Sequence, residues 1–233
     1  MNIISSCALQ RYSIVKSINY INQIKHCATA HSVIPIHCHS RHSMSTHSRR
    51  ITQLYIDNRA LQQLPIDKET RNYIRDPVEH ACFSLVKPTP IKNPRLVIHS
   101  ISALQLIDLS VTCYTIDEIV KYLSGNDIIP GSQPAAHCYC GHQFGYFSGQ
   151  LGDGATMYLC EVINDKNDRI ELQLKGGGLT PYSRTADGRK VLRSSLREFL
   201  CSEHMHALGI PTTRAGTCIT SDSKVMRDVC STP

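Results

Sequence analysis

The chain has 233 residues, of which 41% are hydrophobic and 19% are charged, a composition typical of one or two globular domains. Its 25 Lys and Arg residues exceed its 19 Asp and Glu residues, which gives a formal net charge of +6. Six basic residues and no acidic ones precede Asp57, so the rest is nearly neutral and does not indicate a nucleic-acid partner. No apolar run approaches the roughly 20 residues of a membrane-spanning helix, so no membrane partner is expected.

The 11 cysteines are odd in number and irregularly spaced, and no C-x-x-C occurs. Cys138 and Cys140 form a C-x-C, but no second pair lies at zinc-site spacing. This pattern favours reduced, mostly buried thiols over a disulfide framework or a metal site.

Residues 1–53 are expected to form a mitochondrial transit peptide or disordered leader. They contain no Asp or Glu, and their apolar positions recur at helical spacing beside basic residues, at Ile14, Val15, Ile18, Ile21 and Ile24. An amphipathic, basic and acid-free N-terminus is typical of transit peptides. The alternatives are a merely disordered tail and an untranslated-region artefact. The His-rich string at residues 37–42 favours disorder over metal binding.

From about Leu54 the composition changes, and the mature protein is expected to start there. Short strands are predicted at residues 80–86 and 96–99, followed by a short helix at residues 100–109. A further helix is predicted at residues 117–123, because two acidic residues lie in its first turn and a glycine follows its end.

The densest pattern begins at Gly141, since eight of the 13 glycines fall between Gly141 and Gly178. Residues 143–151 predict a strand that runs into a glycine loop at residues 149–154. Strands are then predicted at residues 157–162 and 169–175, joined by a polar hairpin turn. Alternation of leucines with polar residues in the last of these strands places Lys175 on its polar face.

A helix follows, for which Asp187 is the predicted cap and Gly209 the stop. Its predicted core stripe consists of Leu192, Leu196 and Leu200, with Glu198 on another face. Two short strands are predicted after it, at residues 217–220 and 224–229.

The order of these parts is that of a protein-kinase N-lobe: strand, glycine loop, strand, strand with a lysine, and helix with a glutamate. Glycines let backbone N–H groups approach phosphate, and Lys175 can contact phosphate as a point charge. Glu198 can hold that lysine through an ion pair. The glycines spell neither G-x-G-x-x-G nor a Walker A motif, so a purely structural role for them stays open.

Three strings closely resemble the selenoprotein O family of kinase-like protein adenylyltransferases: GHQFGYFSGQLGDGATMYL, ELQLKGGGLTPYSRTADGRKVLRSSLREFLCSE and LGIPTTRAGTCITSDSKVMRDV. The resemblance runs from about Leu54 to Val229. It implies an α+β fold in which residues 141–233 form a kinase-like N-lobe, an antiparallel sheet plus an equivalent of the kinase C-helix. Residues 54–140 are then a family-specific extension. The family is tied to mitochondria in eukaryotes, which agrees with the acid-free leader.

The resemblance also implies that ATP binds in a flipped orientation and that AMP is transferred to Ser, Thr or Tyr hydroxyls of protein substrates. Lys175 then matches the phosphate-contacting lysine, and Glu198 its ion-pair partner. The other nucleotide contacts implied by the family are Gly152, Gly154, Ala155, Asp187 and Gly188. Gly177 stands where the family more commonly has alanine, and little consequence is expected.

The family continues beyond the end of this sequence into a helical C-lobe, which carries the catalytic aspartate and the Mg²⁺ ligands. No catalytic residue and no metal ligand is therefore assigned within the 233 residues, and this truncated chain is expected to be inactive alone. The alternatives are a non-catalytic nucleotide-binding or interaction fragment and, less favoured, an ordinary Ser/Thr kinase.

Overall fold

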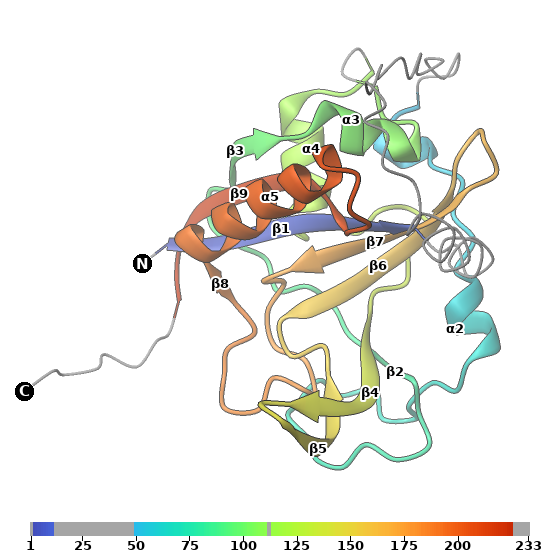
Figure 1. Ribbon diagram of the computed structural model, residues 1–233, viewed down its shortest axis with the longest axis vertical. Coiled ribbons are helices and arrows are strands. Elements are labelled where there is room, and N and C mark those ends of the chain that lie inside the picture. Colours follow the sequence, from blue (N-terminus) through green and yellow to red (C-terminus); the bar gives the residue numbers. More distant parts are fainter. Residues whose placement is uncertain (1, 12–48, 111–112, 226–233) are drawn as a thin grey trace, which may run out of the picture.

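The computed structural model describes residues 2–11, 49–110 and 113–225 of the chain (Figure 1). Its strands are β1 (Asn2–Arg11), β2 (Phe83–Leu85), β3 (Arg95–His99), β4 (Ala135–Gln143), β5 (Tyr146–Gly152), β6 (Thr156–Ile163), β7 (Arg169–Lys175), β8 (Lys190–Val191) and β9 (Arg214–Lys224). Its helices are η2 (Ile51–Gln53), α2 (Arg59–Gln63), α3 (Ile101–Leu104), η3 (Gln105–Ile107), α4 (Ile116–Leu123) and α5 (Leu192–Ala207). None of the helices in these ranges has the length and hydrophobicity that crossing a bilayer requires.

The strands form one sheet in the order β2-β4-β6-β7-β1-β9-β3, with β5 paired to β4 and β8 paired to β1. Each of these strand pairs is antiparallel. The predicted α+β class with an antiparallel sheet is therefore confirmed.

The predicted hairpin of residues 157–175 is present as β6 and β7. The side chain of Asn164 closes its turn, because its Oδ1 accepts the backbone N–H groups of Lys166 and Asp168 at 3.0 and 2.8 Å. The alternation of β7 buries its leucines as expected, but Glu171 on the polar face is also 0% exposed. Further along the chain, β9 is longer than the strand predicted at residues 217–220, and most of the strand predicted at residues 224–229 lies outside the described residues.

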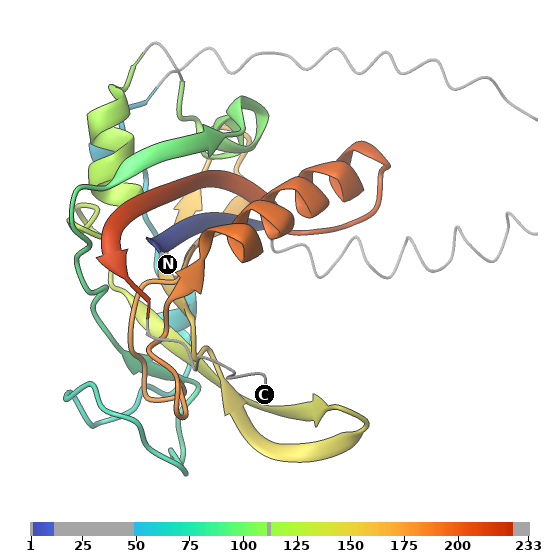
Figure 2. The ribbon, with the colours of Figure 1, turned by 90° about the vertical axis from the view of Figure 1, so that its left-hand side faces the viewer.

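Two helices cover opposite faces of the sheet (Figure 2). Ile219 of β9 packs in the main core with Ile119 and Leu123 of α4. The neighbouring Cys218 packs with Phe199 of α5. Because successive residues of a strand point to opposite faces, α4 lies on one side of β9 and α5 on the other.

Helix α4 begins where its sequence predicts, because Thr115 forms a capping box with Glu118. The Thr115 hydroxyl accepts the Glu118 backbone N–H at 3.1 Å, and the Glu118 carboxylate accepts the Thr115 N–H at 3.4 Å.

Helix α5 differs from its prediction at both its start and its buried face. It begins at Leu192 without a side-chain cap, so the prediction that Asp187 caps it is wrong. The Asp187 carboxylate instead accepts the backbone N–H of Arg189 at 2.9 Å. Leu200 is 61% exposed whereas Phe199 is 5% exposed, so the buried stripe is turned by one residue from the predicted one.

The predicted leader is partly folded, since Asn2–Arg11 forms strand β1 rather than a disordered tail. The positions expected to form an amphipathic helix, and the His-rich string, lie outside the described residues. Ile51 is 0% exposed in the core, so the folded body includes residues before the expected start at Leu54.

One sheet runs through both predicted segments of the mature protein. The predicted boundary after residue 140 falls inside β4, and β3 from the first segment pairs with β9 from the second. Residues before and after that boundary therefore position the same site.

Candidate nucleotide site

The glycine loop lies between β5 and β6, and close packing requires its glycines. Gly149 and Gly152 belong to β5, so the loop itself is shorter than predicted and spans residues 153–155. A Cβ on Gly152 would lie 2.3 Å from the ring of Tyr182, and one on Gly154 would lie 2.5 Å from the Tyr182 carbonyl oxygen. Both glycines therefore allow the loop to lie directly against the chain around Tyr182.

Two buried hydroxyls fasten this loop. Thr180 Oγ1 donates to the Asp153 carbonyl at 2.7 Å, and Ser183 Oγ donates to the Gly154 carbonyl at 2.6 Å. Thr180 is 0% exposed and Ser183 is 4% exposed, so water does not compete for these bonds. The loop is thus held from the side of the protein core, and the backbone N–H groups of Asp153 and Gly154 are themselves bonded, to the carbonyls of His137 and Gly152, both at 2.9 Å.

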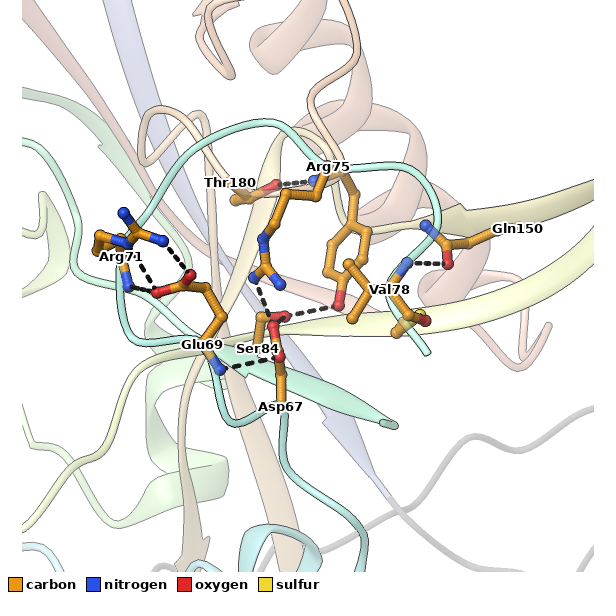
Figure 3. Close-up of polar contacts among 10 residues, drawn as sticks. Asp67, Glu69, Arg71, Arg75, Val78, Ser84, Gln150 and Thr180 are labelled. Carbon is orange, nitrogen blue, oxygen red and sulfur yellow. Dashed lines mark hydrogen bonds and ion pairs between the residues drawn. The ribbon is translucent and has the colours of Figure 1, made fainter. Parts of the chain in front are cut away.

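The segment that carries these hydroxyls rests in turn on residues 67–84 (Figure 3). The Asp67 carboxylate binds the Arg75 guanidinium and accepts the Ser84 hydroxyl, which also contacts the Tyr182 hydroxyl at 2.8 Å. The Arg75 backbone N–H donates to the Pro181 carbonyl at 3.0 Å. Burial raises the pKa of Asp67, but the hydrogen bonds from Arg75, Glu69 and Ser84 outweigh it and hold that pKa below its usual value.

The predicted ion pair is formed, since Lys175 Nζ lies 3.0 Å from Glu198 Oε1. Lys175 is the last residue of β7, and Glu198 lies on α5. Both side chains are half-buried. The pair links the lysine strand to the helix and holds the lysine ammonium near the end of β7.

The chain after Lys175 connects the loop to Asp187 and Gly188. The Gly176 N–H donates to the Ala155 carbonyl at 2.7 Å, and the Gly178 N–H donates to the Gly188 carbonyl at 3.3 Å. A Cβ on Gly188 would lie 1.9 Å from the Gly178 carbonyl oxygen, so glycine is required there. These contacts bring Ala155, Lys175, Gly188 and Glu198 together near the end of β7, while Gly152 and Gly154 pack against Tyr182.

A buried arginine supports the same turn. Arg189 is 8% exposed and donates to the Gly176 carbonyl at 3.1 Å and to the Thr89 carbonyl at 2.8 Å. Burial lowers the pKa of this guanidinium. Its donors satisfy two carbonyls that would otherwise be left in the interior.

Acidic groups lie beneath the loop. The Asp153 carboxylate accepts the His137 backbone N–H at 3.3 Å, and His137 Nε2 lies 3.5 Å from Glu171 Oε1. Burial raises the pKa of Asp153; Glu171 adds to the rise, while His137 and Lys175 oppose it. The ammonium of Lys175 is thus within electrostatic reach of the loop carboxyl.

Comparison with known proteins places this chain in a family. A family model described as "Protein adenylyltransferase SelO" matches residues 70–233. The chain belongs to the SelO family. The resemblance to selenoprotein O proteins expected from the sequence is therefore confirmed.

The relatives of this SelO-family chain are much longer than it is. It is 55% identical over 194 residues to "Protein adenylyltransferase SelO, mitochondrial" of Mus musculus, covering 80% of this chain and 29% of the relative. The human protein of the same name is also 55% identical, over the same shares. This chain is also 52% identical over 176 residues to "Protein nucleotidyltransferase YdiU" of Methylobacillus flagellatus, covering 76% of this chain and 34% of the relative. The chain therefore spans about a third of these relatives.

The described part of this SelO-family chain places one cation, the ammonium of Lys175, at the candidate site. Within those residues no group of three or more His, Cys, Asp or Glu side chains is arranged to hold a metal ion. The ammonium of Lys175 can neutralise phosphate oxygens by charge.

Sequence reasoning missed the supports of the site. No role was predicted from the sequence for Thr180, Ser183 or Arg189. The two hydroxyl residues nevertheless follow the triple glycine within five positions, in the string GGGLTPYS. Hydroxyls at short spacing beside glycines are a signal for side chains that bind backbone carbonyls. The supporting Asp67 and Arg75 carried no such signal, because their links to the site run from Arg75 to Pro181 and from Ser84 to Tyr182, about 100 residues away along the chain.

Proposed function

We propose that this chain is the nucleotide-binding, kinase-like N-lobe of a SelO-family protein adenylyltransferase, preceded by a family-specific extension. The observation that supports it is the ion pair of Lys175 with Glu198 beside a glycine loop fastened from below, in a chain of this family. The proposed ligand is ATP, which the family name implies. The proposed nucleotide contacts are Gly152, Gly154, Ala155, Lys175, Asp187 and Gly188, with Glu198 as the ion-pair partner of Lys175. The acceptors in the complete protein are hydroxyls of protein substrates.

For the 233 residues alone, the proposed activity is ATP binding without AMP transfer. The described residues include Lys175, the lysine proposed to contact phosphate, and among them no group of three or more His, Cys, Asp or Glu side chains is arranged to hold a metal ion. Phosphoryl and nucleotidyl transfer depend on such organisation of the phosphates. A mitochondrial location is proposed from the acid-free leader and from the mitochondrial names of the mouse, zebrafish and human relatives.

The test is titration of the purified chain with ATP in a calorimeter. Wild type is expected to bind, and Lys175→Ala is expected to weaken binding by roughly tenfold or more, since one charged contact to phosphate is lost. Lys166→Ala is the matched control, because Lys166 is an exposed lysine in the β6–β7 turn. Equal affinities for all three proteins would reject the proposed site.

A second measurement addresses transfer itself. The chain is incubated with ATP labelled in its α-phosphate, together with candidate protein substrates, and label on protein is counted. No incorporation is expected. Incorporation that Lys175→Ala abolishes would show that the chain alone transfers AMP, and the mass added to the substrate would distinguish AMP from phosphate.

A second candidate function is a non-catalytic interaction fragment. Apolar side chains are exposed on α5 and just beyond it, with Leu200 at 61%, Leu208 at 59% and Ile210 at 48%. Beside them lies an open cavity of about 400 Å³ that Glu198 helps to line. Association of the chain through this surface, without ATP binding, would favour this candidate.

A further inference from the structure

An open cavity of about 500 Å³ has three cysteines in its wall, Cys82, Cys138 and Cys140. All three are free thiols, and none belongs to the proposed nucleotide site. We propose that Cys82 and Cys138 form a reversible disulfide in this cavity by exchange with a small-molecule disulfide. Formation of this bond does not depend on ATP binding, so the inference goes beyond the proposed function.

The register of β2 against β4 brings two of these thiols face to face. Phe83 pairs with His137, and their rings meet edge to face with centroids 4.6 Å apart. At the next position along, the Cys138 backbone N–H donates to the Cys82 carbonyl at 2.8 Å, so Cys82 stands opposite Cys138. Cα atoms of directly opposite residues are roughly 4.5–5.5 Å apart, within the roughly 4.4–6.8 Å that a disulfide spans.

The cavity gives both thiols a common space. Opposite side chains of an antiparallel pair lie on one face, and Cys82 and Cys138 both line the cavity. The two thiols are also close enough to interact electrostatically. A hydrogen bond from the Val78 backbone N–H to Gln150 Oε1, at 2.7 Å, joins two walls of the cavity (Figure 3). Since the cavity is open and both cysteines are half-buried, a small disulfide can reach them.

The third thiol, Cys140, is a poorer partner for Cys138. It is exposed, and it pairs across the strands with Gln150 of β5 rather than with a cysteine. Cys138 and Cys140 are two residues apart on one strand, which separates their Cα atoms by roughly 6.5 Å. That separation is close to the upper limit for a disulfide, so Cys82 is the partner that the geometry favours.

The exchange takes two steps. The thiolate of Cys82 attacks one sulfur of the small disulfide, which forms a mixed disulfide and releases one small thiol. Cys138 then loses its proton and attacks the Cys82 sulfur, which forms the 82–138 bond and releases the second small thiol. The protein gives up two protons and two electrons, and the small disulfide takes up both. Burial raises the pKa of the Cys138 thiol, which makes Cys138 the second thiol to react.

The proposed bond lies next to the support of the glycine loop. Cys138 packs in the same apolar cluster as Tyr182, and its thiol interacts with the Tyr182 hydroxyl. The ring of Tyr182 lies against Gly152, where an added Cβ would come within 2.3 Å of it. A disulfide draws the Cys138 sulfur toward β2 and away from Tyr182. Weaker ATP binding by the oxidised chain is therefore expected, and this consequence rests on the proposed function.

The first test maps the bond in the full chain. The reduced protein is incubated with glutathione disulfide and glutathione at a series of ratios, its remaining thiols are alkylated, and its peptides are analysed by mass spectrometry. Cys82 and Cys138 are expected to lose their free thiols together, as one crosslinked pair that excess glutathione opens. Cys160 and Cys218, each 0% exposed, are expected to stay reduced.

Two results would overturn the proposal. One is that Cys82 and Cys138 stay reduced, or carry only separate glutathione adducts, while the exposed Cys201 reacts. The other is a bond from Cys138 to Cys140 in place of Cys82. Cys138→Ser is expected to abolish the crosslink, whereas Cys140→Ser, the matched control on the same strand, is expected to keep it. Loss of the 82–138 bond in Cys140→Ser would also contradict the pairing.

The second test is calorimetric titration of ATP into the oxidised and the reduced chain. The Kd of wild type is expected to rise roughly threefold or more on oxidation, and that of Cys138→Ser is expected to be the same in both conditions. Equal Kd values for oxidised and reduced wild type would overturn the link through Tyr182. Absence of ATP binding by the reduced chain would instead reject the proposed function, and the mapped crosslink would still decide the thiol site.

Discussion

Removing the hydroxyl of Thr180 should loosen the glycine loop. Thr180→Val keeps the shape of the side chain but deletes the donor to the Asp153 carbonyl at 2.7 Å and the acceptor for the Tyr182 N–H at 3.2 Å. Thr180 is 0% exposed, so these backbone groups lose a partner that water cannot replace. At about 1–3 kcal/mol for each buried group left unpaired, the free energy of unfolding should fall by about 2 kcal/mol or more.

The same change should weaken ATP binding if the fastened loop is the ligand surface. Residues 153–155 would have to be ordered again on binding. After partial compensation the total cost should be about 1.4 kcal/mol or more, which corresponds to roughly a tenfold or larger rise in Kd. Ser183→Ala removes the donor to the Gly154 carbonyl at 2.6 Å and should act in the same direction. Because both hydroxyls hold one loop, the double variant should lose less than the sum of the two single effects.

The assay combines urea unfolding with calorimetric ATP titration for each variant. Ser148→Ala is the control, because the Ser148 hydroxyl is buried on β5 but has no hydrogen-bond partner within the described structure. It should change neither quantity appreciably. If Thr180→Val lowers the unfolding free energy while Kd stays within about twofold of wild type, the hydroxyls stabilise the fold only and the reasoning about the loop fails.

Three further changes follow from the geometry. Gly188→Ala should lower the free energy of unfolding in urea by about 2 kcal/mol or more, because residue 188 has a φ of +67° and an added Cβ would overlap a carbonyl oxygen. Gly209→Ala is the comparison: residue 209 has a φ of +76° but open space around an added Cβ, so it should lower that free energy by about 1 kcal/mol. Burial raises the pKa of Asp153, so the stability linked to its proton is present below the usual carboxyl pKa and is lost as pH rises through the raised value. Asp153→Asn should therefore gain stability relative to wild type between acidic and neutral pH, and an unchanging difference would refute this. Arg214→Leu leaves the partly buried Glu203 without its bidentate partner and should cost about 3 kcal/mol, whereas Arg95→Leu, at an exposed pair, should cost little in the same assay.

The sequence predicts the parts of the site that repeat at short range. The two-residue alternation of β7 places Lys175 correctly opposite its leucines, and the helical run places Glu198 within reach of it. Both follow from local periodicity, which fixes the face on which a side chain lies. The buried Glu171 could not be foreseen, because its burial depends on His137 from another strand.

The position of β1 could not be predicted for a similar reason. Its ten residues are mixed in polarity and lie in an acid-free leader, so composition alone favours a targeting segment. The strand exists only through its pairing with two edges that lie more than 150 residues away in the chain. Residues 2–11 form a strand because of the strands on either side of them, rather than because of the intrinsic strand preference of their amino acids.

The proposed nucleotide site is supported by residues that lie outside the predicted N-lobe, residues 141–233. The hydroxyls of Thr180 and Ser183 donate hydrogen bonds to the carbonyls of the loop. The segment that contains them is in turn supported by Asp67, Arg75 and Ser84. The lysine strand is flanked by β1, and α5 is tied to β9 through the ion pair of Glu203 with Arg214. A lobe cut at residue 141 would keep every predicted nucleotide contact but lose the Asp67 network and the β3 edge. Such a shortened protein should bind ATP more weakly than the whole chain, because the grip depends on the extension for its geometry.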